Sequence, residues 1–269
     1  MTTATLDMMT LNTWGFRWPL ARHRATRFDR LQRHLSEDQY DVVLLQELWA
    51  GAKTALGDTG MVWTGEDAQT QRGVRMVESG LGVKVRRGLS RSVGAVRELV
   101  RSFSHHRGWD RVKTKGIFSV EVQTSQGPVT FVNTHLQAQE NQARIRRTQL
   151  DEVLEALDQT RTPVVLAGDF NLFDRNAEDR AAAASLERHG FRDASLSLDR
   201  PDATYLSANP YVPERDDHRF DRIYLRDGAR AADGRRVRLT AESVHVIVDH
   251  TAPFSDHEAV AAKIRIERD

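Results

Sequence analysis

The sequence predicts two β-sheets that pack face to face, with helices on the outside of the sandwich. Short apolar runs of strand length recur along the 269 residues, and only a few segments have the spacing of an amphipathic helix. Many strands with few helices are typical of layered sheets covered by helices. No linker, internal repeat or low-complexity tract divides the chain, so we predict one domain over residues 1–269.

The first half of the chain contains one clear helix between predicted strands. Residues 6–13 alternate weakly between apolar and polar and indicate a strand. Residues 21–38 have apolar side chains at helical spacing and indicate an amphipathic helix, and the apolar run at 41–47 indicates a buried strand. Residues 79–85 and 90–96 are interpreted as paired strands around an intervening turn.

The second half combines six predicted strands with two helices. The strands are expected at residues 115–124, 129–134, 163–167, 220–225, 237–246 and 259–266, and the helices at residues 140–158 and 178–189. A turn at Gln126 and Gly127 joins the first two of these strands. The long irregular segment at 201–217 is of a kind that is usually functional or mobile.

The composition restricts the function before any motif is considered. Hydrophobic residues make up 39% and charged residues 29%, as in a globular protein, and the formal net charge is +1. A near-neutral chain lacks the overall basic field of many nucleic-acid binders. The absence of cysteine excludes disulfide scaffolds, thiolate zinc sites and cysteine nucleophiles.

Nothing in the sequence is typical of export or membrane insertion. The first residues show no signal peptide, and no apolar run is long enough to span a bilayer. We therefore expect a cytoplasmic protein without a transmembrane segment, which meets a membrane only from its surface, as a peripheral protein.

Polar side chains close several of the apolar strands. A carboxylate or amide at the end of a buried strand is costly unless it is paired, so it rarely serves stability alone. Residues of this kind are Asn12, Gln46, Glu47, Asn133, His135, Asp169, Asn171, Asp256 and His257. If these strand ends meet at one rim of the sandwich, they form an oxygen-rich site without thiolates. Such a site favours Mg²⁺ or Mn²⁺ over structural zinc.

Six motifs in order resemble those of the endonuclease/exonuclease/phosphatase superfamily, which has the deoxyribonuclease I-like fold. They are LNTWG, LLQELW, NTHLQAQ, LAGDFN, RFDRIYL and SDHEAV, and they run from Leu11 to Val260. Each motif alone is weak, but six in the right order over nearly the whole chain are specific. The resemblance implies an α+β fold, a four-layer α/β/β/α sandwich of two mixed, mainly antiparallel sheets.

The same resemblance implies a metal site. Glu47 is the expected principal ligand, with Asn12 beside it and Asp256 supporting the metal or the base. The expected cofactor is Mg²⁺, for which Mn²⁺ or Co²⁺ can substitute. Such a cation polarises phosphoryl oxygens and stabilises a leaving alkoxide. The alternative for Asn12 is a plain turn residue.

The resemblance also implies which residues move protons and hold the phosphate. His257 is the expected general base, because imidazole titrates near neutrality. Asp221 is expected to orient it, although the family more often has R-x-D-Y where this chain has R-F-D-R. The remaining assignments are His135 as a donor to phosphate or to the leaving oxygen, Asp169 and Asn171 as positioning groups for water and phosphoryl oxygens, and Lys115 as a counter-charge to phosphate.

Within the superfamily, the chain is most similar to the neutral sphingomyelinases and related phospholipases C. Trp49 stands where apurinic endonucleases usually carry lysine. Asp110 and Lys115, followed by a glycine, match a pair that is thought in the sphingomyelinases to switch the site between inactive and active arrangements. The alternative for this pair is a surface ion pair, which would contribute little to stability.

These observations lead to three hypotheses of different classes. The first is a Mg²⁺-dependent phosphodiesterase that cleaves a phospholipid at a membrane surface, with sphingomyelin giving ceramide and phosphocholine. The second is a nuclease acting on DNA or RNA, which the arginine-rich stretch at 17–33 leaves open. The third is a non-catalytic lipid- or partner-binding module.

An apolar loop bears on the first hypothesis. Trp14, Phe16, Trp18 and Pro19 directly follow the first predicted strand, at the expected rim of the site. Four apolar groups at such a place suit contact with lipid, with a sugar or with a base. The alternative is a loop packed against the protein.

Overall fold

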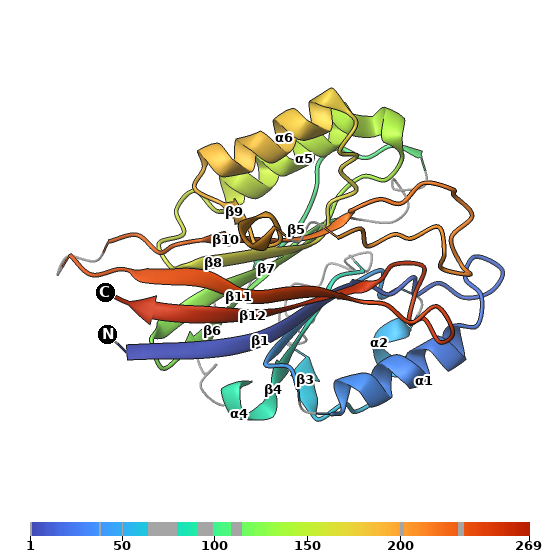
Figure 1. Ribbon diagram of the computed structural model, residues 1–269, viewed down its shortest axis with the longest axis horizontal. Helices are drawn as coiled ribbons and strands as arrows, with labels where there is room; N and C mark the ends of the chain where they lie inside the picture. Colours follow the sequence, from blue (N-terminus) through green and yellow to red (C-terminus); the bar gives the residue numbers. More distant parts are fainter. Residues whose placement is uncertain are drawn as a thin grey trace, which may run out of the picture.

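The computed structural model describes residues 2–37, 39–49, 51–63, 80–90, 99–108, 115–199, 202–230 and 234–269. In these residues the chain forms two six-stranded sheets that pack face to face, with helices on both outer surfaces (Figure 1). The arrangement confirms the four-layer α+β sandwich that the sequence predicts.

The first sheet, called sheet A, contains the first and last described strands. In spatial order its strands are β11 (Val237–Ile247), β12 (Ala259–Arg268), β1 (Thr2–Asn12), β2 (Val42–Gln46), β4 (Gly82–Arg86) and β3 (Met61–Trp63). β1 and β2 run parallel, and the other neighbouring strands are antiparallel.

The second sheet, called sheet B, has the same mixed character. In spatial order its strands are β5 (Leu99–Ser102), β6 (Gly116–Thr124), β7 (Gly127–His135), β8 (Val164–Asp169), β10 (Asp221–Arg226) and β9 (Arg192–Asp193). β7 and β8 run parallel, and the other neighbouring strands are antiparallel. Each sheet therefore has one parallel pair, whose two strands end at the same edge.

Helices cover the outer face of each sheet. α1 (Arg24–Leu35) and α2 (Ala52–Ala55) lie on sheet A, and α5 (Ala143–Ala156) and α6 (Ala177–Arg188) lie on sheet B (Figure 1). The shorter elements are α4 (Arg87–Ser90), η2 (Glu140–Gln142) and η3 (Leu196–Leu198). Among the helices of the described ranges, none has the length and apolar character needed to cross a membrane.

The apolar run of β2 shows how the layers are held together. Val42 and Leu44 belong to the apolar cluster between the two sheets, whereas Val43 and Leu45 belong to the cluster between sheet A and α1. Successive side chains of a strand point to opposite faces, so a strand that is buried on both faces needs a continuous apolar sequence. A third apolar cluster lies between sheet B and the helices α5 and α6.

Two polar residues at strand ends join the sheets instead of lining a pocket. Gln46 of sheet A donates from Nε2 to Asn133 Oδ1 of sheet B at 2.7 Å. Asn133 Nδ2 in turn donates to the backbone oxygens of Leu45, at 2.8 Å, and Gly82, at 2.9 Å. Both side chains are fully buried, so these bonds offset much of the cost of burying their polar groups and join the two sheets at this point.

The strand expected at 79–85 is present as β4, whose described partners are β2 and β3. The helical turn α4 follows it directly, and Ser90, the first residue of the partner strand expected at 90–96, belongs to α4 and not to a strand. Residue 79 and residues 91–96 lie outside the described residues.

Candidate active site

Strand register brings the polar strand ends to one edge of the sandwich. In sheet B, His135 of β7 and Asp221 of β10 both stand opposite Asp169 of β8. In sheet A, Asn12 of β1 stands opposite the last residue of β2. The parallel pair of each sheet therefore ends beside that of the other sheet, and the residues that follow the strands meet there.

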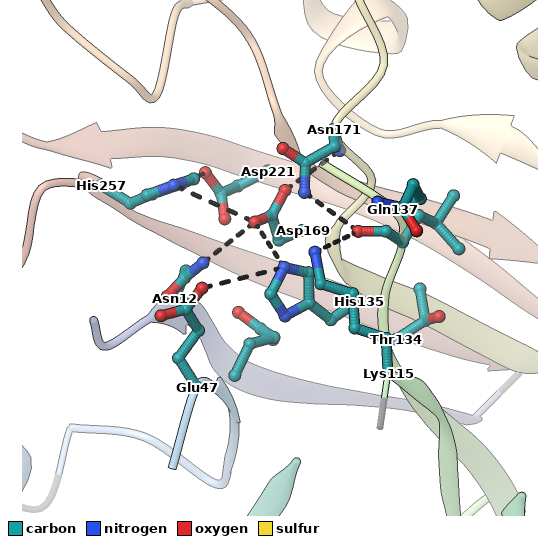
Figure 2. Close-up of polar contacts among 12 residues, drawn as sticks. Asn12, Glu47, Lys115, Thr134, His135, Gln137, Asp169, Asn171, Asp221 and His257 are labelled. Carbon is teal, nitrogen blue, oxygen red and sulfur yellow. Dashed lines mark hydrogen bonds and ion pairs between the residues drawn. The ribbon is translucent and has the colours of Figure 1, made fainter. Parts of the chain in front are cut away.

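A pocket of about 420 Å³ opens at this edge. Most of the residues that the sequence selects line it, namely Asn12, Glu47, Lys115, His135, Asp169, Asn171, Asp256 and His257. Asp221 joins the site through its contact with His257 (Figure 2). Asp110 lies outside the described residues, so its pairing with Lys115 stays a prediction.

Asp169 is the residue on which the other groups converge. Its Oδ2 accepts a hydrogen bond from Asn12 Nδ2 at 3.0 Å and lies 3.2 Å from His135 Nε2. Its Oδ1 accepts from the backbone N–H of Asn171 at 3.0 Å. Burial disfavours its charge, but His135 and His257 outweigh burial and hold the pKa of Asp169 well below its usual range. Asp169 therefore stays ionised and connects the two sheets (Figure 2).

His257 and Asp221 form a hydrogen-bonded pair at the side of Asp169. His257 Nδ1 lies 2.8 Å from Asp221 Oδ2, so the ring donates its Nδ1 proton and turns Nε2 into the pocket. Thr204 holds the carboxylate from the other side, because its hydroxyl donates to Asp221 Oδ2 at 2.7 Å and accepts from the Asp221 N–H at 3.0 Å. This arrangement fixes the tautomer of an imidazole that can exchange a proton.

The charges around His257 favour its protonated form. Burial opposes that form, but Asp221 and Asp169 outweigh burial and raise the pKa of His257 to about 10. Burial raises the pKa of Asp221, although the attraction of His257 acts in the opposite direction. A cation among these carboxylates would offset their negative charge and favour the neutral ring that a general base requires.

Glu47 occupies a strained position directly after β2. Its backbone has a φ of 58°, a conformation that residues other than glycine rarely adopt and that often marks functional sites. Its carbonyl oxygen accepts from the backbone N–H of Gly15 at 3.1 Å, and a Cβ on Gly15 would approach that oxygen to 2.1 Å. The close approach of these two chain segments therefore requires glycine, and it turns the Glu47 side chain into the pocket.

The surroundings of Glu47 fit a bound cation. Its Oε2 is buried and has no hydrogen-bond partner among the described residues. Burial and the neighbouring Asp256 raise the pKa of Glu47 to about 7, and burial also raises the pKa of Asp256. Asn12 Oδ1 accepts one bond, from the backbone N–H of Trp14 at 3.0 Å, and keeps a second lone pair. An oxygen-only set of this kind suits Mg²⁺.

A second group of residues also has metal-like spacing. The ligand atoms of Asp169, Asp221 and His257 all lie within 4.8 Å of one another. The Asp221 oxygen that faces His257 is already engaged by that ring and by Thr204, so we assign these residues to proton transfer. Asp221 Oδ1, like Glu47 Oε2, is buried without a hydrogen-bond partner among the described residues, but Glu47 lines the pocket and Asp221 does not. The Glu47 side is therefore the better place for a cation.

Lys115 and Asn171 share one backbone oxygen at the far side of Asp169. Lys115 Nζ donates to the carbonyl of Leu136 at 2.7 Å, and Asn171 Nδ2 donates to the same oxygen at 3.1 Å. Lys115 is only 2% exposed, so its charge acts inside the protein and not as half of a surface ion pair. Asn171 has a φ of 49°, a second strained backbone at this edge.

Sequence reasoning missed the wall of the pocket opposite the metal side. Tyr205, Glu214, His218, Phe173 and Phe220 line it. Tyr205 and Glu214 lie in the irregular segment at 201–217, and His218 directly follows it. The unusual length of that segment was the one feature of the sequence that indicated a functional role there. His218, which no sequence pattern selects, stacks on Phe220 with ring centroids 4.8 Å apart.

Arg27 is another residue that the sequence did not reveal. It lies on α1, is fully buried, and donates to the backbone oxygens of Thr13 at 2.8 Å, Trp14 at 2.9 Å and Phe254 at 3.0 Å. Burial lowers the pKa of Arg27 to about 10, although Asp256 acts in the opposite direction. Arg27 thereby fixes the chain on both sides of the pocket, after β1 and before β12.

Comparison with known proteins agrees with this geometry. The model of the Endonuclease/Exonuclease/phosphatase family matches residues 9–257. Members of this family are metal-dependent phosphodiester hydrolases. No curated protein sequence matches the chain.

The solved structures with a similar fold include the following three. D. rerio TDP2 complexed with a single-strand DNA product is 23% identical, with a TM-score of 0.73 over 97% of this chain and 99% of that one. A beta toxin mutant from Staphylococcus aureus with bound magnesium ions is 16% identical, with a TM-score of 0.70 over 96% and 99% of the two chains. SmcL is also 16% identical, with a TM-score of 0.68 over 97% and 98%. At these identities the likeness shows the fold alone.

The assignment of the cation to Glu47 can be tested by binding alone. Glu47→Gln removes the carboxylate with the unpartnered oxygen, so we expect the affinity for Mg²⁺ to fall by about a hundredfold. Glu140→Gln is the matched control, because Glu140 also lines the pocket and its loss changes the net charge equally. Isothermal titration calorimetry of both variants decides the question. Equal losses would mean that the ion responds only to the overall charge of the pocket.

Proposed function

Because the chain belongs to the endonuclease/exonuclease/phosphatase family, we propose that it hydrolyses the phosphodiester bond of a phospholipid whose head group carries a positive charge. In its most specific form, the proposal is a phospholipase C-type hydrolysis of sphingomyelin to ceramide and phosphocholine. The observation that carries it is the charge of the pocket wall beyond the expected metal ligands.

The described lining of the pocket is strongly acidic. It includes the five carboxylates of Glu47, Glu140, Asp169, Glu214 and Asp256, and among the described residues Lys115 is its one lysine and no arginine lines it. A bound cation and Lys115 would offset the charge of one phosphate. Glu140 and Glu214 then remain at the mouth, where they would repel a chain of further phosphates and attract a cationic group.

Aromatic rings lie beside Glu214, one of these two carboxylates. The Tyr205 hydroxyl donates to Glu214 Oε2 at 2.7 Å, and the Tyr205 ring lies 5.0 Å from the His257 ring. Phe220 contacts both Tyr205, at 5.5 Å, and Phe173, at 4.9 Å between ring centroids. Ring faces combined with a carboxylate are the usual recognition site of a quaternary ammonium group. Because the Tyr205 ring lies only 5.0 Å from the His257 ring, an ammonium group bound at Tyr205 would be joined to the reacting phosphate by a short chain of atoms.

The residues of the pocket can be assigned to the steps of the hydrolysis. His257 Nε2 takes a proton from water as its oxygen attacks phosphorus, and Asp221 stabilises the ring that becomes charged. The bond between phosphorus and the lipid oxygen breaks, and the released alcohol takes up a proton. When bound, Mg²⁺ would polarise the phosphoryl oxygens and stabilise the leaving alkoxide. Asn171 and Lys115 would stabilise charge on the phosphoryl group.

A nuclease is the second candidate. Arg17 and Arg22 are exposed on the segment between β1 and α1, beside the pocket, and such side chains suit phosphates of a nucleic acid. The acidic rim disfavours this alternative, because a nucleic acid would place its neighbouring phosphates near Glu140 and Glu214.

The proton-transfer pair predicts a graded series of variants. His257→Ala should lower kcat by about 10²–10⁴, the usual contribution of a positioned base. Asp221→Asn should lose much of the same activity, and Thr204→Val, which removes one hydrogen bond to the carboxylate, should lose about tenfold. Hydrolysis of para-nitrophenyl phosphocholine with Mg²⁺ measures the rates, and thermal unfolding controls for the fold. Full activity of Asp221→Asn would show that the carboxylate does not support the ring.

The acidic, aromatic wall predicts selectivity for a cationic substrate. Glu214→Gln and Tyr205→Leu should each raise the KM for para-nitrophenyl phosphocholine about threefold to thirtyfold, the range expected from loss of a cation–π or charge contact. The KM for para-nitrophenyl ethyl phosphate, which lacks the ammonium group, should not change. Equal effects on both substrates would contradict head-group recognition. If plasmid DNA is nicked faster than any choline ester is cleaved, and His257→Ala abolishes the nicking, the nuclease is correct.

A further inference from the structure

The segment that connects β1 to α1, residues 13–23, is called the strap. It carries the two most exposed of the large hydrophobic side chains in the described residues, Trp18 at 81% and Leu20 at 59%. A single exposed apolar side chain is common on protein surfaces. Two on one short segment, one of them a tryptophan, form a patch that water solvates poorly.

The strap is fixed to the protein on both sides of this patch. On one side, Trp14 packs over Arg27, with the guanidinium carbon 4.9 Å from the ring centroid, and Phe16 packs on Trp49 at 4.6 Å between ring centroids. On the other side, Arg22 donates to the backbone oxygen of Pro210 at 3.2 Å. The expected apolar loop is therefore divided, because Trp14 and Phe16 face the protein and Trp18 faces solvent.

The patch lies beside the mouth of the pocket. Phe16 stands two residues before Trp18 and packs on Trp49, and Trp49 lines the pocket. Figure 1 shows the strap, drawn in blue after β1, at the end of the sandwich where the long loop before β10 also lies. Any surface that covers Trp18 would therefore also lie next to the mouth.

Positive charge surrounds the patch. Arg17 and Arg22 are exposed, Arg24 is half-buried at the start of α1, and residues 13–23 contain no acidic side chain. Burial and, to a smaller extent, the charge of Arg17 lower the pKa of Arg24. The strap thus combines two exposed apolar side chains with exposed arginines, whereas the pocket beside it is acidic.

We propose that the strap docks on the surface of a phospholipid bilayer, with Trp18 and Leu20 among the acyl chains and Arg17 and Arg22 at the lipid phosphates. Tryptophan is favoured at this boundary, and arginine can keep its charge at phosphate depth while its stem lies against apolar groups. The positive charge of these arginines favours a bilayer that contains anionic lipid. The inference rests on the proposed function, since docking there would present the pocket to the head groups of the same surface.

Vesicle binding tests the docking without any reaction. The full chain is sedimented with vesicles of phosphatidylcholine and with vesicles of phosphatidylcholine mixed with phosphatidylglycerol. Trp18→Ser and Leu20→Ser should each weaken binding by about tenfold to a hundredfold, because each removes apolar area that the bilayer buries. Leu196→Ser is the matched control, since Leu196 is 50% exposed but lies on η3 and not on the strap. Arg17→Gln should weaken binding more to the anionic vesicles than to the phosphatidylcholine vesicles.

Rates separate this inference from the proposed function. For Trp18→Ser, the ratio of the rate on sphingomyelin vesicles to the rate on para-nitrophenyl phosphocholine should fall as binding falls, and for Leu196→Ser it should not. If the wild type cleaves the soluble ester but binds neither kind of vesicle, the docking is wrong and the function stands. If it binds vesicles through Trp18 but cleaves no choline ester, the function is wrong and the docking stands. Equal losses for Trp18→Ser and Leu196→Ser would contradict the assignment to the strap.

Discussion

The contact that the rest of the site depends on is the hydrogen bond from Asn12 to Asp169, which joins the ends of two strands in opposite sheets. Asp169 also faces His135 and the backbone N–H of Asn171, so one carboxylate fixes the spacing of three segments: the ends of β1 and β7 and the turn after β8. The residue before Asp169 lets β8 lie close to β7 within sheet B. Gly168 has a φ of 142°, and a Cβ there would lie 2.0 Å from the backbone oxygen of Thr134. Only glycine lets the strands approach this closely at that point.

Asp169 divides a single acidic pocket into two environments. On one side, His257, Asp221 and Thr204 form a chain of hydrogen bonds that can hold or release a proton. On the other side, Glu47 and Asp256 repel each other and Glu47 Oε2 has no partner among the described residues, so a cation would complete that side. The remaining carboxylates, at the rim, face solvent beside aromatic rings. The pocket therefore suits the proposed substrate, which has one phosphate and one positive group and would be presented by the surface on which the strap would rest.

Much of this could be predicted from the sequence, because parallel strands end at the same edge and a polar residue that closes an apolar strand is conspicuous. That reasoning selected Asn12, Glu47, Asp169 and His257. It could not separate Gln46 and Asn133, which have the same pattern but bind each other between the sheets. Thr204, Tyr205 and Glu214 lie in an irregular segment without periodicity, and Arg27 looks like an ordinary charged residue of an amphipathic helix. Their roles arise from tertiary contacts, which no local pattern encodes.

The central claim is the division of the pocket into a cation side and a proton side. Crystals of the protein soaked in Mn²⁺ test it directly, because anomalous diffraction locates manganese without reference to activity. The account predicts a manganese peak about 2.1 Å from a Glu47 carboxylate oxygen, with His257 Nδ1 still hydrogen-bonded to Asp221. A single peak bound by Asp169, Asp221 and His257, with Glu47 turned away from it, would contradict it.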